Sequence, residues 1–362
     1  MNILHIHPSL AGGGIESMIC ALANEMAKSE NITVCSIFEP KGTDTFWYKL
    51  SPSVRKITLK KKNIGFSFKV LLDIYRIIRR GNFDVVNVHG MFYYYVLSIL
   101  LLHKKIRFFY TIHSDARMEN SKWDKRLFFL KKISFNKGWM HPITISKVSQ
   151  ESFHNLYHCS SFLIFNGVTR PVLTQIDLAS RFRINGSHTK IFLHAARIST
   201  PKNQLVLCKV FKKLIDEGYD IVLLIAGAKQ RDDIFSSIEP FFGDRIKYLG
   251  ERNDIPQLMA YCDGMCLPSL WEGLPITLLE ALSVGCIPIC SNVGGIPDVI
   301  KSGKNGFLSI SSSEHDYYLA MKEFLSLSSE QYLAMKRNCI ESFSSYDIIN
   351  TAESYISTYK SV

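Results

Sequence analysis

Two acidic residues that flank a glycine loop are the part of the sequence best suited to chemistry. The stretch 268–281 reads PSLWEGLPITLLEA and places Glu272 eight residues before Glu280. We expect a strand to end where this stretch starts and a helix to begin close to Pro275, where a missing N–H costs nothing. The amides from Gly273 to Ile276 then lie at the positive end of the helix dipole, which suits a diphosphate.

Glu280 lies on an otherwise apolar helix, and a carboxylate on a buried face needs partners to offset its desolvation. A ribose diol supplies two hydroxyl donors, so Glu280 is a candidate for holding a nucleoside. The plainer interpretations are a surface carboxylate for Glu280 and a helix-start acid for Glu272. The loop between the two residues favours a function for both.

Two cations lie on either side of a turn earlier in the chain. Arg197 and Lys202 occur in the stretch 195–203, AARISTPKN, after an expected strand. A forked guanidinium and a point-like ammonium converging on one place suit a pair of phosphates. Basic residues are common in loops, so the value of this pair depends on its position in the sheet.

Apolar runs alternate with helix-length segments along the chain, which is the pattern of an α/β fold. In the first half, a strand over 2–7 leads through the glycines 12–14 into a helix over 15–28. Further strands are expected at 32–38, 54–59, 84–89, 107–113, 142–146 and 161–165, with helices at 66–80 and 149–157. The apolar stretch 91–102 is too short to cross a bilayer, which needs about 20 residues.

A second alternation starts at residue 190, after a stretch rich in Pro, Gly, Asn and Ser. Two doubly wound parallel sheets in tandem follow from this pattern, and ligands of such sheets bind beyond the carboxyl ends of the strands. We therefore predict a first domain over 1–168, a linker over 169–189, a second domain over 190–345, and a C-terminal helix over 346–362 that packs back on the first domain.

These motifs resemble those of the retaining glycosyltransferases of family 4, which have the GT-B architecture. The resemblance is carried by Arg197 with Lys202, by the Glu272–Glu280 block and by the stretch 292–298, NVGGIPD. In the first half, the stretches 13–16 (GGIE), 84–90 (DVVNVHG), 111–113 (TIH) and 166–168 (NGV) also match. The likeness covers nearly the whole chain, and the two glutamates with their loop are its most specific part.

The resemblance implies two Rossmann-like domains that face an interdomain cleft, with the acceptor side in the first and the nucleotide-sugar in the second. Arg197 and Lys202 would hold the diphosphate, Glu272 would lie near the donor sugar, and His113 would reach the sugar hydroxyls. Glu280 would bind the ribose. The implied donor-binding set is completed by Gly13, Gly14, Glu16, Gly273, Leu274, Pro275 and Ile276.

Two features of the sequence bear on what the resemblance implies for phosphate binding and for metal use. The glycine that commonly follows the phosphate-binding lysine is Asn203 here, and no Asp-x-Asp occurs. We therefore predict that no divalent metal and no other cofactor is required, because Arg197 and Lys202 take the place of Mg²⁺ at the leaving diphosphate.

The net charge of +11 is confined to the first half of the chain. Residues 1–170 carry 24 Lys and Arg against 11 Asp and Glu, whereas residues 171–362 carry 19 against 21. The basic clusters are 55–62, 104–107 and 122–137, the last of them interleaved with aromatic and apolar residues. Such a segment suits an anionic membrane surface, although a solvated helix face is an equal alternative. Nucleic acid is not expected as a partner, since no nucleic-acid-binding motif is present.

The nine cysteines lie mostly inside apolar runs, as reduced buried thiols do, which favours a reducing compartment. The N-terminal stretch MNILHIHPSL lacks a basic region and a cleavage site, so a secretory leader is not expected. We thus expect a cytoplasmic protein, peripheral on the inner face of the cell membrane.

The sequence thus predicts transfer of a hexose or N-acetylhexosamine from a UDP- or GDP-sugar to a lipid-linked or growing polysaccharide. A GT-B partner protein without activity is the first alternative. A dinucleotide-dependent oxidoreductase is the second, but Ser17 stands where its third glycine would be.

Overall fold

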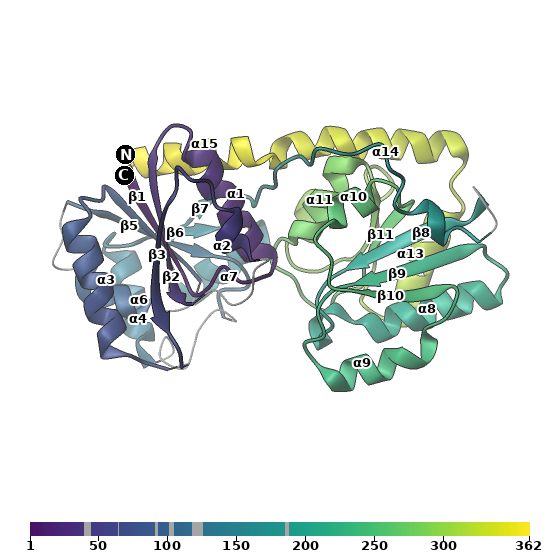
Figure 1. The fold of residues 1–362 in the computed structure, drawn as a ribbon, viewed down its shortest axis with the longest axis horizontal. Helices are drawn as coiled ribbons and strands as arrows, with labels where there is room; N and C mark the ends of the chain where they lie inside the picture. The colour runs from purple at the N-terminus through teal and green to yellow at the C-terminus, as the bar shows by residue number, and fades with distance from the viewer. Residues whose placement is uncertain (40–44, 64, 91–92, 101–104, 118–125, 185–187) are drawn as a thin grey trace. The chain divides into compact units, whose positions relative to one another are not determined.

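The computed structural model describes residues 1–39, 45–63, 65–90, 93–100, 105–117, 126–184 and 188–362. The chain divides into two compact units (Figure 1). Unit 1 comprises Met1–Thr169 and Asp347–Val362, and unit 2 comprises Arg170–Tyr346. Most of the expected linker therefore belongs to unit 2, where Thr174 exchanges hydrogen bonds with the Gln257 amide at 2.9 and 3.0 Å.

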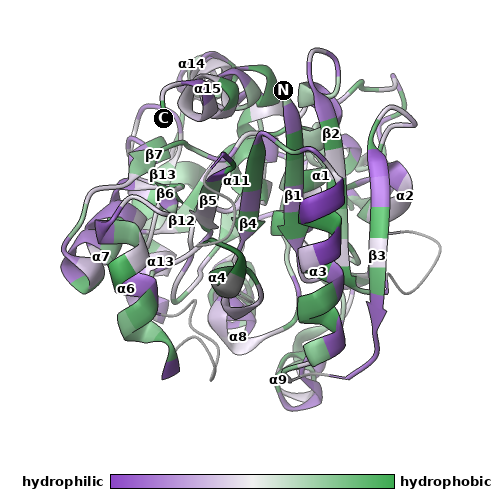
Figure 2. Cartoon of the chain, turned by 90° about the vertical axis from the view of Figure 1, so that its left-hand side faces the viewer, coloured by the Kyte–Doolittle hydropathy of each residue, from purple (hydrophilic) through white to green (hydrophobic). Residues whose placement is uncertain are grey.

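Unit 1 contains a parallel sheet of seven strands in the order β3-β2-β1-β4-β5-β6-β7. Its strands are β1 (Asn2–His7), β2 (Asn31–Phe38), β3 (Arg55–Lys61), β4 (Val85–His89), β5 (Arg107–Ile112), β6 (His141–Thr144) and β7 (Phe162–Leu163). The central strands are buried, as expected where helices cover both faces of a sheet. The edge strand β3 has no buried residue and is partly exposed, and Figure 2 shows hydrophilic residues at its ends.

The helices of unit 1 lie on both faces of this sheet. They are α1 (Gly14–Met26), α2 (Phe46–Lys49), α3 (Phe68–Arg80), α4 (Tyr94–Leu100), α6 (Phe128–Asn136), α7 (Lys147–Tyr157) and α15 (Ile348–Lys360). Leu4, Ile6 and Val86 form one core with residues of α3, α4, α6 and α7. Because side chains alternate along a strand, Phe109 faces the other way and packs on Tyr359 of α15, with ring centroids 4.7 Å apart.

The helix α15 is attached to the sheet by a buried polar layer as well as by apolar contacts. The Asn87 amide donates to the Tyr359 hydroxyl at 2.8 Å, and Thr111 donates to the Asn87 carbonyl at 3.1 Å. At the start of the helix, Asp347 caps the amide of Ile349. These contacts tie the last segment of the chain to unit 1 because buried polar groups need such partners.

Unit 2 contains a parallel sheet of six strands in the order β10-β9-β8-β11-β12-β13. Its strands are β8 (Lys190–Ala195), β9 (Ile221–Ala226), β10 (Ile246–Gly250), β11 (Gly264–Leu267), β12 (Ile287–Ser291) and β13 (Phe307–Ser309). Its helices are α8 (Gln204–Asp216), α9 (Asp232–Ile238), α10 (Ile255–Met259), α11 (Ile276–Val284), α12 (Ile296–Val299), α13 (Glu314–Leu325) and α14 (Ser329–Phe343). Within the described residues, short 3-10 turns are found at η1 (Ser180–Phe182), η3 (Thr200–Lys202), η4 (Glu239–Phe241) and η5 (Ser344–Tyr346).

In both sheets the order in which successive strands are added reverses beside the first strand. Doubly wound folds bind their ligands at this switch point. In unit 1 the switch point lies between β1 and β4, and in unit 2 it lies between β8 and β11. The loops that follow β8 and β11 carry Arg197, Lys202 and Glu272. The two Rossmann-like units predicted from the sequence are therefore confirmed.

One basic residue departs from the expectation of a charged surface. Lys131, in the cluster 122–137, is buried on α6, and its ammonium lies 4.2 Å from the centroid of the Tyr110 ring. A cation over an aromatic face is attracted by the ring quadrupole, which offsets part of its desolvation. Arg126, Phe129, Leu130 and Lys137 of this cluster are exposed, as is Trp139 just after it. Lys104 and residues 122–125 lie outside the described part of the chain.

The described residues form no helix that is both long and apolar enough to span a membrane. The nine cysteines are free thiols, and eight of them are buried.

Candidate active site

The loop after β8 carries the two cations expected to hold a diphosphate. Arg197 is exposed, and within the described residues its guanidinium has no hydrogen-bond or ion-pair partner. Lys202 ends the short turn η3, and its Nζ lies 2.6 Å from Oε1 of Glu272. The guanidinium is therefore ready to bind an anion, whereas the ammonium is already shared with a carboxylate.

Glu272 comes from the loop after β11, so the ion pair joins two strand ends at the switch point. Ser269 donates a second hydrogen bond of 2.6 Å to the same oxygen of Glu272. The side chains of Lys202 and Glu272 are 20% and 9% exposed, which makes this a partly desolvated pair. Replacing either partner alone would leave a charge without compensation.

Two further contacts hold these loops together. The amide of Leu270 donates to the carbonyl of Pro201 at 2.8 Å. Asn203 has a left-handed backbone with φ 54°, and its side-chain amide donates to the carbonyls of Pro268 and Ser312 at 3.1 Å each. Asparagine tolerates this conformation better than most residues, which explains why it can stand where the resemblance leads one to expect glycine.

The Arg197 loop rests on a buried pair of side chains that the sequence did not reveal. His194 and Gln204 are both fully buried. The His194 Nδ1 contacts the Cys266 carbonyl at 2.9 Å, so that nitrogen carries the proton and Nε2 accepts from the Gln204 amide at 3.1 Å. The same amide donates to the Arg197 carbonyl at 2.9 Å. Burial lowers the pKa of His194 to about 4, which keeps the ring in this neutral form.

Two glycines allow the backbones of the site to approach closely. A Cβ on Gly294, whose φ is 56°, would overlap the carbonyl oxygen of Glu272, and the neighbouring Gly295 amide donates to Gly273 at 2.7 Å. A Cβ on Gly227 would overlap the carbonyl oxygen of Ala196. Gly294 lies in a motif noted in the sequence, whereas Gly227 follows β9 without a motif that could have identified it.

The helix α11 begins close to Pro275, as expected. Pro275 is the N-cap residue rather than part of the helix, and Ile276 is the first helical residue. Since proline has no N–H, the expected row of amides from Gly273 to Ile276 is interrupted at its third position. Leu274 and Ile276 are buried, and Gly273 is half-buried.

Glu280 lies one turn into α11 and is partly buried. Within the described residues its carboxylate has no hydrogen-bond or ion-pair partner. Burial raises the pKa of this carboxyl to about 7, because the charged form is poorly solvated. Hydroxyl donors from a ligand would relieve this penalty.

In unit 1, His113 follows β5 and is the end of a chain of three buried histidines. The His113 Nε2 lies 3.1 Å from Nδ1 of His89, and the His89 Nε2 lies 2.9 Å from Nδ1 of His5. Burial lowers the pKa of His113 to about 3 and that of His5 to about 4, and it lowers the pKa of His89 well below its usual value. The three rings are therefore neutral at pH 7.

Neutral rings allow only two proton arrangements along this chain. Each ring carries one proton and each contact needs one, so the three protons must all point toward His5 or all toward His113. The protonation of His5 and His89 thereby determines which ring nitrogen of His113 carries its proton. Neither His5 nor His89 was predicted as a site residue, although a histidine near the end of each of the expected strands 2–7 and 84–89 was a signal.

The remaining predicted residues of unit 1 lie in the loop after β1. Gly13 is the N-cap residue of α1, Gly14 is its first residue, and Glu16 lies in its first turn. They thus lie at the switch point of unit 1, while Arg197, Lys202, Glu272 and Glu280 lie in unit 2.

Comparison with known proteins agrees with this geometry. Residues 12–170 match the profile of the family described as Glycosyltransferase Family 4, and residues 179–342 match that of Glycosyl transferases group 1. An Escherichia coli protein named UDP-Gal:alpha-D-GlcNAc-diphosphoundecaprenol alpha-1,3-galactosyltransferase is 24% identical over 318 residues, which cover 78% of each chain. The Staphylococcus aureus capsular polysaccharide biosynthesis glycosyltransferase CapH is 23% identical, with 81% of this chain and 82% of the relative covered.

The fold also has close counterparts among solved structures. Anabaena Alr3699/HepE in complex with UDP superposes with a TM-score of 0.81 over 100% of both chains, at 18% identity. None of these likenesses supports the oxidoreductase alternative. The two family profiles together cover most of both units, and the chain belongs to family 4 of the GT-B glycosyltransferases.

Proposed function

We propose that this glycosyltransferase moves a hexose or N-acetylhexosamine, with retention, from a UDP- or GDP-sugar to a lipid-linked or growing polysaccharide. Lipopolysaccharide, O-antigen and capsule are the proposed classes of product. The Escherichia coli relative is named for a UDP-sugar donor and a diphosphoundecaprenol-linked acceptor, and the Staphylococcus aureus relative for capsular polysaccharide. These names support the proposal for donor and acceptor.

The observation that carries this proposal is the exposed Arg197 guanidinium, which has no partner within the described part of the chain, on the same loop as Lys202 of the Lys202–Glu272 ion pair. Arg197 supplies a fork of donors for a diphosphate, and Lys202 adds a second positive charge on the same loop. The hydrogen bond from Leu270 to Pro201 ties this loop to the one that leads into α11. A departing diphosphate would thus gain its stabilisation from preorganised cations without a metal ion.

The other residues take roles around the transferred sugar. Glu280 accepts from the ribose hydroxyls, Glu272 lies near the donor sugar, and His113 contacts sugar hydroxyls. In the reaction, the bond from the sugar C1 to the diphosphate breaks, and a bond from C1 to the acceptor oxygen forms. The proton of the acceptor hydroxyl is released with the nucleotide.

The alternative of a partner protein without activity keeps the same fold. It is disfavoured because Arg197, Lys202, Glu272, Glu280 and His113 are all present, and because the exposed Arg197 guanidinium has no partner among the described residues and can bind a ligand. Turnover of a sugar nucleotide is the observation that separates the two.

We further propose that the protein works in the cytoplasm on an anionic membrane surface. The exposed residues Arg126, Phe129, Leu130, Lys137 and Trp139, here called the α6 patch, combine positive charge with apolar side chains. Such surfaces bind anionic lipids by charge and by shallow insertion.

The donor is tested by thermal unfolding of the protein with a panel of nucleotides and nucleotide-sugars. A ligand at a hundred times its dissociation constant adds about 2.7 kcal/mol of stability. We expect one UDP- or GDP-compound to raise the melting temperature, and Arg197→Ala to weaken its binding by about tenfold or more through loss of a charge-assisted hydrogen bond.

Arg337→Ala is the matched control. Arg337 is exposed on α14, and its substitution removes the same charge from unit 2. This variant should bind as the wild type does. Turnover of the donor found in this way should continue in the presence of a chelator. Stabilisation by no nucleotide, or equal binding by both arginine variants, would overturn the proposal.

A further inference from the structure

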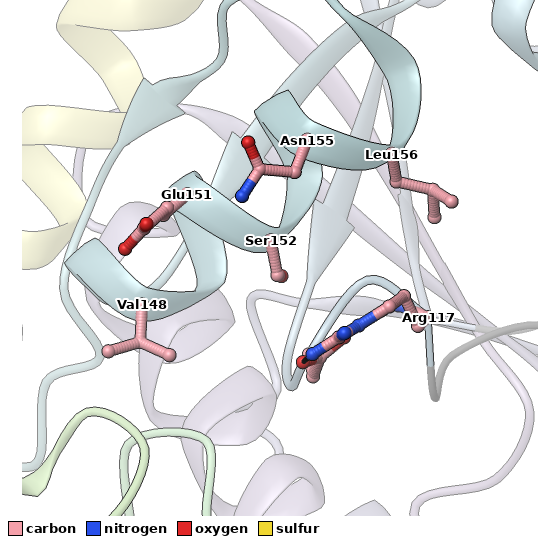
Figure 3. Close-up of a pocket in the computed structure, with 7 residues that line it drawn as sticks. Arg117, Val148, Glu151, Ser152, Asn155 and Leu156 are labelled. Atoms are coloured by element: carbon pink, nitrogen blue, oxygen red, sulfur yellow. Dashed lines mark hydrogen bonds and ion pairs between the residues drawn. The ribbon is translucent and has the colours of Figure 1, made fainter.

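A pocket of unit 1 lies directly beyond the strand that leads to His113. It has a volume of about 390 Å³ and is formed between α7 and the loop that follows β5. This volume lies in the lower part of the range for small-molecule sites, roughly 300–1,000 Å³. Its described lining consists of Asp115, Arg117, Val148, Glu151, Ser152, Asn155 and Leu156 (Figure 3).

The pocket is held in shape by hydrogen bonds between the loop and the helix. Ser152 accepts from the amide of Ala116 at 3.0 Å, and Ser149 donates to the carbonyl of Ser114 at 3.0 Å. Two serines one turn apart on α7 thus fix the backbone that leaves His113. Figure 3 shows the Ser152 side chain directed toward Arg117, across the space between helix and loop.

The polar lining offers both donors and acceptors. The Arg117 Nε donates to Oδ1 of Asp115 at 3.0 Å, and this pairing lowers the pKa of the Asp115 carboxyl, so the group is ionised. The exposed Glu151 and Asn155 add a carboxylate and an amide from α7. A sugar ring presents hydroxyls that both donate and accept, and such a set matches them.

The charge of the lining argues against a phosphate as the ligand. The lining contains two carboxylates, those of Asp115 and Glu151, and one guanidinium, which is already paired with Asp115. A second anion here would meet repulsion from like charges. Val148 and Leu156, two turns apart on α7, supply apolar surface for the C–H face of a ring.

We infer that this pocket binds a neutral sugar ring of the acceptor. The inference rests on the proposed function, because it assigns the acceptor to the same edge of the unit 1 sheet as His113. Parallel sheets bind ligands at this edge, and Asp115 follows His113 by two residues. The pocket therefore takes the sugar end of the acceptor rather than its phosphate.

The test fills the pocket without touching the proposed donor residues. Val148→Trp places a large side chain in the lining, and His154→Trp introduces the same side chain at an exposed position of α7 outside the pocket. Methyl glycosides of glucose, galactose, mannose, N-acetylglucosamine and N-acetylgalactosamine serve as probes in saturation-transfer NMR. We expect at least one to bind the wild type and His154→Trp alike, and to bind Val148→Trp at least tenfold more weakly.

Donor binding separates a failure of this inference from a failure of the proposed function. Stabilisation by the nucleotide, and hydrolysis of the donor without acceptor, should be the same in the wild type and both variants. If nucleotide binds but no glycoside does, or if Val148→Trp binds glycoside as the wild type does, the inference is wrong while the function stands. If inorganic phosphate displaces the bound glycoside, the chemical class is wrong. If no nucleotide binds, the proposed function itself fails.

Discussion

The carboxyl group of Glu280 is poorly solvated because of its burial and has a folded-state pKa of about 7 against an ordinary value of 4.5. A group whose pKa is raised by folding contributes its stability in full below the unfolded pKa and loses it as the pH rises through the folded pKa. Glu280 therefore destabilises the protein above pH 7. We expect Glu280→Gln to raise the free energy of unfolding at pH 8 by about 2 kcal/mol and to change it little at pH 4.5.

Denaturant unfolding of both proteins at the two pH values measures this effect. Glu323→Gln, on the exposed side of α13, is the control and should show no such dependence on pH. The same Glu280→Gln change should weaken nucleotide binding, since an amide oxygen accepts from ribose hydroxyls less strongly than a carboxylate does. If the gain in stability of Glu280→Gln over the wild type is no larger at pH 8 than at pH 4.5, the burial assigned to Glu280 is wrong.

The sequence revealed the charged residues of the site but few of their partners. Glu272 and Lys202 were identified separately, yet their ion pair joins positions 70 residues apart, and no local pattern encodes that pairing. The same is true of His5, His89 and His113, which three strands bring into one line. Gln204 and His194 looked like ordinary members of a helix and a strand. Only the register of the sheet shows that they support the Arg197 loop.

The loops that form the site depend on glycines as much as on charges. Gly294 combines a left-handed backbone with direct contact against the Glu272 carbonyl. We expect Gly294→Ala to destabilise the protein by about 2 kcal/mol or more, because backbone strain and a steric overlap add together. Nucleotide binding should weaken as well, because the displaced carbonyl belongs to the residue that holds Lys202.

Gly303→Ala is the matched control for this prediction. Gly303 has a similar backbone, with φ 78°, but a Cβ there would meet no atom within 4 Å. This variant should be destabilised only by the strain of the left-handed backbone, by about 1 kcal/mol, and should bind nucleotide normally. Equal melting temperatures and equal nucleotide affinities for the two variants would show that the contact with Glu272 is unimportant.

Hydrophobic periodicity predicted the central strands well because they are buried on both faces. The strands β1, β2, β4 and β5 begin and end within one residue of the expected positions. Short edge strands were less predictable: the expected strand 161–165 is reduced to Phe162–Leu163. An edge strand pairs with only one neighbour, so the extent of that pairing, rather than the local sequence, decides where the strand ends.

The two units share one topology without a detectable repeat in sequence. The strand order 3-2-1-4-5-6 occurs in both sheets, so each has a switch point beside its first strand. The helix α15 packs on the sheet of unit 1 although it is last in the chain. The polar layer of Asn87, Thr111 and Tyr359 specifies this packing. The sequence suggested a returning helix, but the tyrosine contacts became visible only in the structure.

The excess positive charge of the first half leads to a final prediction about the α6 patch. Lys131 is buried among aromatic rings and contributes nothing to a surface, so the patch relies on Arg126 and Lys137 for charge and on exposed Phe129 and Leu130 for insertion. Figure 2 shows hydrophobic residues along α6. We expect the protein to sediment with vesicles that contain anionic lipid and not with zwitterionic vesicles, and added salt should weaken this binding by screening.

The two contributions of the patch are separable by substitution. Arg126→Ala with Lys137→Ala should weaken binding by about thirtyfold, since each basic residue near the surface contributes about 1 kcal/mol. Phe129→Ser with Leu130→Ser should weaken binding at high salt as well, because insertion of apolar side chains is not screened. Ile310→Ser, at an exposed apolar position in unit 2, is the control and should bind as the wild type does. If the control and the patch variants bind vesicles equally, another surface holds the protein at the membrane, and the basic first half serves a different purpose.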